Sequence, residues 1–103
     1  DRLFSEEVFG PVLTVSQFTD EIDAISQANA SELGLASGVW TSNLGRAHRM
    51  VASLHTGVVH VNTYGGADNT VPLGGYKQSG NGHDKSLHAI EKFINKKTAW
   101  IKV

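Results

Sequence analysis

The sequence predicts an α/β fold in which short strands and single helices alternate. Apolar runs rich in strand-forming residues alternate with segments of helical periodicity over residues 11–61, in the order β-α-β-α-β. A long glycine-rich segment without periodicity follows over residues 62–83, and a helix and a final strand complete the 103 residues. Strands joined by single helices favour a largely parallel sheet.

The first strand is predicted over residues 11–18, where valines and a phenylalanine form a short apolar run. Asp20 is placed to cap the helix that follows, and the acidic residues of its first turn suit the positive end of the helix dipole. Gly34 is placed to end this helix. The apolar stripe of the helix is expected to consist of Ile22, Ile25, Ala28 and Leu33.

A second strand is predicted over residues 37–41, and either Ser42 or Asn43 caps the next helix. Gly57 is expected to end that helix, and the run "VVHV" over residues 58–61 predicts the third strand. The buried stripe of the second helix is expected to consist of Leu44, Ala47, Val51 and Leu54, with Arg46, Arg49 and His55 outside it.

Residues 62–83, "NTYGGADNTVPLGGYKQSGNGH", are too long for an ordinary connection, so they are either functional or disordered. Apolar and aromatic residues within them, including Tyr64 and Tyr76, favour an ordered functional loop. Asp84 is expected to cap a third helix. The tail "KKTAWIKV", residues 96–103, predicts a final strand with apolar side chains on both faces, which needs partners on both.

Composition excludes several classes of function. Nine basic and ten acidic residues are scattered along the chain, so no basic surface for nucleic acid or an anionic membrane is expected. The sequence has no apolar stretch of membrane-spanning length, and its opening residues lead us to expect no leader. Cysteine is absent, which excludes disulfides and thiolate sites within the chain and is compatible with a cytoplasmic location. The first residue is not Met, and we expect the chain to be a piece of a longer protein.

The spacing of the glycines and histidines supports neither a phosphate-binding loop nor a metal site. The run Gly74-Gly75-Tyr76-Lys77 lacks the glycine spacing and the preceding strand of a phosphate-binding loop. The five histidines do not lie four residues apart on one helix, so no metal site is predicted.

The stretch "EEVFGPVL", residues 6–13, places two carboxylates and an aromatic ring directly before a predicted strand. Taken alone, the acidic residues indicate a solvated loop and Phe9 indicates a core residue. A functional role for Glu7 and Phe9 is the alternative, and the residue pattern does not decide between them.

Four ordered blocks carry a resemblance to a known family: "EEVFGPVL", "ASELGLASGVWTSNLGRAH", "GVVHVNTY" and "PLGGYKQSGNG". Together they resemble the C-terminal part of the NAD(P)-dependent aldehyde dehydrogenase superfamily, over essentially all of residues 1–103. The stretch "GGYKQSGNGHDKSLHAIEKF" looks like the γ-glutamyl-γ-aminobutyraldehyde dehydrogenase branch, which acts on an aminoaldehyde of putrescine breakdown.

The resemblance implies that residues 1–95 are the last portion of the catalytic domain and that residues 96–103 are a terminal oligomerisation strand. It also implies a small-molecule aldehyde substrate, NAD or NADP as cofactor, and a homo-oligomer. The family's cofactor domain and its catalytic cysteine, glutamate and asparagine would lie upstream. The chain therefore holds no catalytic residue of its own, and the isolated chain is expected to be inactive.

Site residues are also implied by the resemblance. Glu7 would accept hydrogen bonds from the hydroxyls of the nicotinamide ribose, and Phe9 would pack beside the nicotinamide ring. Ala67 and Leu73 occupy positions that line the aldehyde entrance and are often aromatic, so a wider entrance is expected here. His83 stands where members of this family usually have arginine. The surface contact that the family's arginine makes is therefore in doubt for this chain. The alternative function is a non-catalytic α/β module that self-associates.

Overall fold

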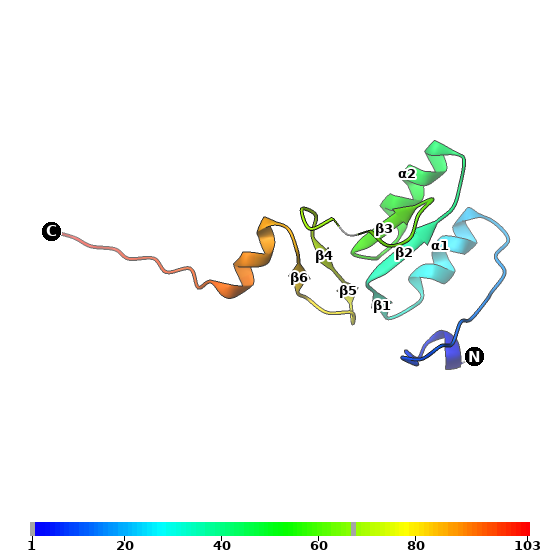
Figure 1. The fold of residues 1–103 in the computed structure, drawn as a ribbon, viewed down its shortest axis with the longest axis horizontal. Helices are drawn as coiled ribbons and strands as arrows, with labels where there is room; N and C mark the ends of the chain where they lie inside the picture. Colours follow the sequence, from blue (N-terminus) through cyan, green and yellow to red (C-terminus); the bar gives the residue numbers. More distant parts are fainter. Residues whose placement is uncertain (1, 67) are drawn as a thin grey trace.

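The computed structural model describes residues 2–66 and 68–103, which form an elongated molecule of 69 × 34 × 25 Å. The helices α1 (Glu21–Asn29) and α2 (Leu44–Ser53) lie beside a sheet of β2 (Ala36–Val39) and β3 (Val58–Val61) (Figure 1). The C-terminal residues lead away from this body as an extended chain (Figure 1). Ala67, one of the two expected entrance residues, lies outside the described residues.

The unit β2–α2–β3 confirms the second and third predicted strands and their parallel connection. Ala36 pairs with Val58 at one end of the ladder and Val39 pairs with Val61 at the other. The buried hydrophobic core is small and centres on α2, with Ala47, Met50 and Leu54 each 7–8% exposed. These three side chains share one helix face because they are three and four residues apart.

The expected stripe of α2 is wrong at Leu44 and Val51, whose side chains are 73% and 46% exposed. Met50 is buried in their place, which rotates the buried face of the helix by about one residue. The helix cap is Asn43 rather than Ser42, because the Asn43 Oδ1 atom accepts a hydrogen bond of 2.8 Å from the Arg46 amide. The helix ends before Leu54, and Gly57 lies beyond it.

Helix α1 begins as predicted, because the Asp20 carboxylate accepts a hydrogen bond of 2.9 Å from the Asp23 amide. It ends at Asn29, so Gly34 does not end the helix. Gly34 belongs instead to β1 (Leu33–Gly34), which also removes Leu33 from the helix stripe. Ile22 is 78% exposed, and the expected stripe is wrong there as well, because no other described segment covers that side of the helix.

No regular strand forms over residues 11–18, which corrects the first predicted strand. A strand satisfies its backbone polar groups by pairing with a neighbour, and none of residues 2–66 and 68–103 supplies that neighbour. The side chains of this segment are correspondingly exposed, with Leu13 at 88% and Val15 at 82%. Before it, a short 3₁₀ helix η1 spans Arg2–Phe4.

The glycine-rich segment contains regular structure, because its short strands form two antiparallel strand pairs. The strand β5 (Tyr76–Lys77) pairs with β1, and β4 (Leu73–Gly74) pairs with β6 (His83–Asp84). Gly57 packs directly against this segment, where a Cβ atom would lie 1.8 Å from the carbonyl oxygen of Gly74. The connection after α2 therefore requires glycine at position 57.

The third helix is a 3₁₀ helix, η2 (Leu87–Phe93), and its cap is Ser86 rather than Asp84. Asp84 lies in β6, and its carboxylate forms an ion pair with Lys92. Residues 94–103 are extended but unpaired, so the final predicted strand does not form within the described chain. In residues 2–66 and 68–103, no helix combines the length and apolar character needed to cross a membrane.

Candidate functional site

Glu7 lies in the N-terminal segment with its side chain exposed to solvent. Among the described residues, no hydrogen bond or ion pair involves its carboxylate. The neighbouring Glu6 differs, because its Oε2 atom lies 2.6 Å from the Arg2 Nε atom in an exposed ion pair. Glu7 therefore has two carboxylate oxygens available to accept hydrogen bonds from a ligand.

Phe9 is 91% exposed, so of the two interpretations that its residue type left open, a core position is wrong. Its backbone φ is +52°, in the left-handed region that a phenylalanine rarely adopts. The chain turns sharply straight after it, where the Val12 amide donates a hydrogen bond of 2.7 Å to the Gly10 carbonyl. Backbone strain at an exposed aromatic residue is typical of binding and active sites.

A cavity of about 600 Å³ separates Glu7 and Phe9 from the body of the domain. Its opposite wall comes from the segment after α1, the segment after α2 and the glycine-rich segment. The polar side chains on that wall are Ser31, Ser37, Thr56, Gln78 and Ser79. The cavity is therefore lined by a carboxylate, an aromatic ring and several hydroxyl and amide groups, which are the kinds of group that line sites for small polar ligands.

A larger cavity of about 820 Å³ lies between the N-terminal segment, α1, β2 and α2. It includes neither Glu7 nor Phe9, and its lining mixes apolar residues such as Phe18, Trp40 and Met50 with polar ones. Among its charged groups, Glu21 and Arg46 are paired with each other, and the Asp20 carboxylate caps α1. Of these two cavities, only the smaller one is lined by Glu7 and Phe9, and Glu7 is a charged group without an internal partner among the described residues.

Leu73 lies in β4, opposite Asp84 of β6, and its side chain is 39% exposed. It does not line the cavity of Glu7 and Phe9, so Leu73 is separate from these two predicted site residues in the structure. The segment before Leu73 is held by Asp68, whose carboxylate accepts hydrogen bonds from the amide and hydroxyl of Thr70 at 2.8 and 2.6 Å. The bond from the Thr70 hydroxyl lowers the pKa of Asp68.

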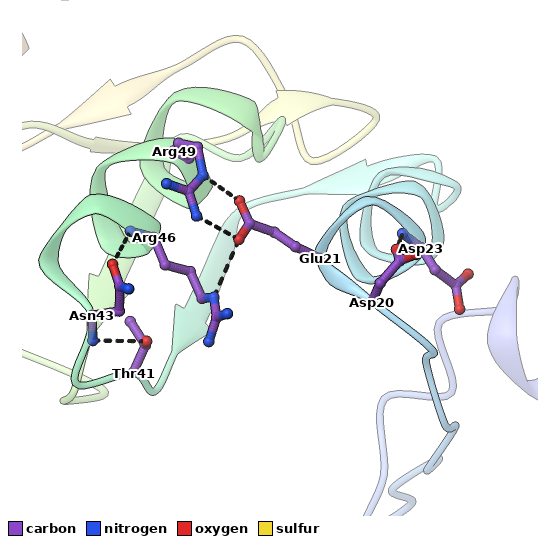
Figure 2. Close-up of polar contacts among 7 residues, drawn as sticks. All are labelled: Asp20, Glu21, Asp23, Thr41, Asn43, Arg46 and Arg49. Carbon is purple, nitrogen blue, oxygen red and sulfur yellow. Dashed lines mark hydrogen bonds and ion pairs between the residues drawn. The ribbon is translucent and has the colours of Figure 1, made fainter.

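A charged cluster joins the two helices beside the larger cavity (Figure 2). The Glu21 carboxylate accepts hydrogen bonds from Arg49 at 2.6 and 2.7 Å and from Arg46 at 3.2 Å. The hydrogen bond from Arg49 is the main cause that lowers the pKa of Glu21 to about 2. The sequence analysis had placed both arginines outside the helix stripe without assigning them a partner.

Comparison with known proteins decides the family. Residues 1–99 match the model of the aldehyde dehydrogenase family. The chain belongs to the aldehyde dehydrogenase family.

Within the residues that the structure describes, no group of three or more metal-ligating side chains comes together.

Individual members of the aldehyde dehydrogenase family align over nearly the whole chain. The NADP/NAD-dependent aldehyde dehydrogenase PuuC of Escherichia coli (strain K12) is 60% identical over 96% of this chain. A betaine aldehyde dehydrogenase of Rhizobium etli is 48% identical over 93%. The crystal structure of an indole-3-acetaldehyde dehydrogenase complexed with NAD+ superposes with a TM-score of 0.91 at 52% identity, over 99% of this chain.

The aldehyde dehydrogenase chain described here spans about a fifth of the length of these relatives, with 20% of the two enzymes covered and 21% of the crystal structure. The small core is consistent with such a partial match. Large apolar side chains are exposed in every part of the molecule, among them Phe9, Leu13, Ile22, Leu87, Phe93 and Trp100.

Proposed function

We propose that these residues work as the C-terminal part of a longer NAD(P)-dependent aldehyde dehydrogenase, which oxidises an aldehyde to a carboxylic acid. The family match over residues 1–99 supports the class of reaction. The 20% coverage of PuuC and of the betaine aldehyde dehydrogenase supports the view that the remaining machinery lies in other residues. The sequence has no cysteine, so the nucleophile that the resemblance implies has to come from outside it.

Within that enzyme, we propose that Glu7 and Phe9 hold the nicotinamide half of the cofactor. The observation that carries this role is the unpaired carboxylate of Glu7, two residues from the exposed and strained Phe9, on the wall of one cavity. NAD(P)+ accepts a hydride when it is bound. Glu7 would bind the two ribose hydroxyls, since a carboxylate offers acceptors only, and Phe9 would restrict where the ring can lie.

The substrate that we propose is an aminoaldehyde, as in the γ-glutamyl-γ-aminobutyraldehyde branch. Support comes from the 60% identity to PuuC and the 48% identity to a betaine aldehyde dehydrogenase. Ala67 and Leu73 would line its entrance, and neither is aromatic, which leaves room for a long or polar aldehyde. The proposal includes a cytoplasmic location, with which a sequence without disulfides is compatible.

The role of Glu7 is tested by Glu7→Gln in the longer enzyme, with Glu6→Gln as the matched control. Glu6 is a fair control because it is adjacent and already paired with Arg2. Losing hydrogen bonds to a charged acceptor should slow hydride transfer in single-turnover kinetics by roughly 10- to 150-fold. The control should keep the wild-type rate, and a wild-type rate in Glu7→Gln would refute the role.

A second candidate function is self-association through residues 96–103. Trp100 is 95% exposed and Ile101 is 84% exposed in an extended, unpaired segment, and such a segment is a template for pairing with another chain. In the longer enzyme this would be the oligomerisation strand. The isolated chain would then be a non-catalytic α/β module whose only activity is self-association.

A further inference from the structure

Three segments that are distant in sequence meet at Asn29 and Lys77. Asn29 is the last residue of α1, and Lys77 lies in β5 of the glycine-rich segment. The third segment is the end of α2, from Ser53 to His55. None of the sequence motifs indicated that these residues come together.

The side chain of Asn29 joins the ends of the two helices. Its Nδ2 atom donates a hydrogen bond of 2.8 Å to the Ser53 carbonyl, and its Oδ1 atom accepts one of 2.8 Å from the His55 amide. The amide group therefore satisfies one acceptor and one donor that are left free where α2 ends. No other residue type of this size offers both a donor and an acceptor in one planar group.

Lys77 joins the glycine-rich segment to the same point. Its Nζ atom donates hydrogen bonds of 2.9 and 2.8 Å to the carbonyls of Asn29 and Ser31. The carbonyls at the end of a helix carry the negative pole of its dipole, so a cation is favoured there. The backbone of Lys77 has φ +54°, an unfavourable conformation that these contacts help to maintain.

Hydrogen bonds to the segment after α1 also hold the two residues that follow Lys77. The Gln78 amide donates a hydrogen bond of 3.0 Å to the Glu32 carbonyl, and the Ser79 hydroxyl accepts one of 2.9 Å from the Gly34 amide. Gln78 and Ser79 line the cavity opposite Glu7 and Phe9. The position of that wall therefore depends on where Lys77 is anchored.

We propose that Asn29 and Lys77 are positioning residues for the cofactor cavity. They act through Gln78 and Ser79, because they fix the glycine-rich segment on the ends of α1 and α2 and so set the distance across the cavity. This inference rests on the proposed function, since it gives the cavity wall a role in binding NAD(P)+. Asn29 and Lys77 would act without touching the ribose or the ring of the cofactor.

The test uses Lys77→Met and Asn29→Asp in the longer enzyme, with Lys85→Met as the control. Methionine keeps the stem of Lys77 but cannot donate, and aspartate keeps the Oδ1 acceptor of Asn29 but loses its donor. The dissociation constant for NAD+ should rise on the order of 2- to 12-fold in each variant, the range that corresponds to the net contribution of a single hydrogen bond. Hydrogen exchange of the Gly34 and Gln78 amides should accelerate in the same variants, and Lys77→Arg should restore both properties.

Three outcomes would overturn the inference or its basis. Faster amide exchange with unchanged NAD+ affinity means that the junction is structural only. Unchanged exchange and affinity in both variants means that the junction does not hold the cavity wall. A wild-type enzyme that binds no NAD+ refutes the proposed function itself, and the inference falls with it.

Discussion

Glu21 and Arg49 form a two-pronged ion pair that joins the first residue of α1 to α2. The Glu21 Oε1 atom lies 2.6 Å from Arg49 Nε, and Glu21 Oε2 lies 2.7 Å from Arg49 Nη2 (Figure 2). Arg46 adds a third contact of 3.2 Å to the same carboxylate. Because the Glu21 side chain is only 23% exposed, this pairing is screened less than an ordinary surface ion pair.

The cluster predicts a pH dependence of stability. The pKa of Glu21 falls from 4.5 to about 2 on folding, chiefly through the hydrogen bond from Arg49. The pairing therefore stabilises the fold fully above pH 4.5, and this contribution declines below that pH and is lost as the pH falls through about 2. Glu21→Gln should make the thermal midpoint less dependent on pH within this window.

The measurement is the thermal midpoint of unfolding as a function of pH, with Glu91→Gln as the control. Asp23, Asp68 and Asp84 also have lowered pKa values, so part of the pH dependence should remain in Glu21→Gln. An identical pH profile in the wild type and Glu21→Gln would show that the cluster does not hold the helices together.

Gly57→Ala should destabilise the fold, because the new Cβ atom would lie 1.8 Å from the Gly74 carbonyl oxygen. Relieving that overlap requires the glycine-rich segment to move, and overpacking of this kind costs roughly 1 to 3 kcal/mol. Gly66→Ala is the control, since no atom of the described residues other than its chain neighbours lies within 4 Å of its added Cβ. In chemical denaturation, Gly57→Ala should unfold at a lower denaturant concentration than Gly66→Ala. Equal midpoints would contradict the close approach of Gly57 to Gly74.

Replacing Ala67 and Leu73 together by phenylalanine should narrow the proposed aldehyde entrance of the longer enzyme. Activity on bulky aminoaldehydes should fall while activity on small aliphatic aldehydes survives, and kcat/KM for both substrates measures this. Val71→Phe adds an aromatic ring to the same segment at an exposed position and serves as the control. Equal losses on both kinds of substrate would mean that these residues are not a gate.

Deleting residues 96–103 should abolish self-association of the isolated chain. Their apolar side chains are exposed, and Lys96, Lys97 and Lys102 should limit pairing to a dimer or small oligomer. Light scattering on the chain with and without these residues decides the matter. A monomer in both cases would rule out this route to association.

The isolated 103-residue chain should not oxidise aldehydes, because it contains no cysteine. Absorbance of NADH in the presence of aldehyde and NAD+ is the measurement, with the intact mass of the protein confirmed first. The longer enzyme is the positive control. Sustained NADH production by the pure chain would contradict the proposed division of the catalytic residues.

The sequence by itself determined the features that depend on neighbouring residues. The cap at Asp20 was predictable, and that of α2 was narrowed to Ser42 or Asn43, because a capping side chain bonds to an amide three residues ahead. The unit β2–α2–β3 followed from apolar periodicity, and the four motif blocks predicted the family before any comparison. The resemblance also singled out Glu7 and Phe9, which residue type alone left undecided.

The tertiary structure decided which surfaces meet. Periodicity placed Leu44 in the stripe of α2, whereas the folded chain leaves Leu44 exposed and buries Met50 instead. The segment over residues 11–18 has the composition of a strand but forms none, because a strand also needs a partner for its backbone.

Contacts between distant residues were likewise invisible in the sequence. Glu21 and Arg49 lie 28 residues apart, and Lys77 and Asn29 lie 48 apart. Local patterns repeat over a few residues, so they carry no information about which ends of the helices and loops converge. That convergence is set by packing, and it places the polar wall of the cavity opposite Glu7 and Phe9.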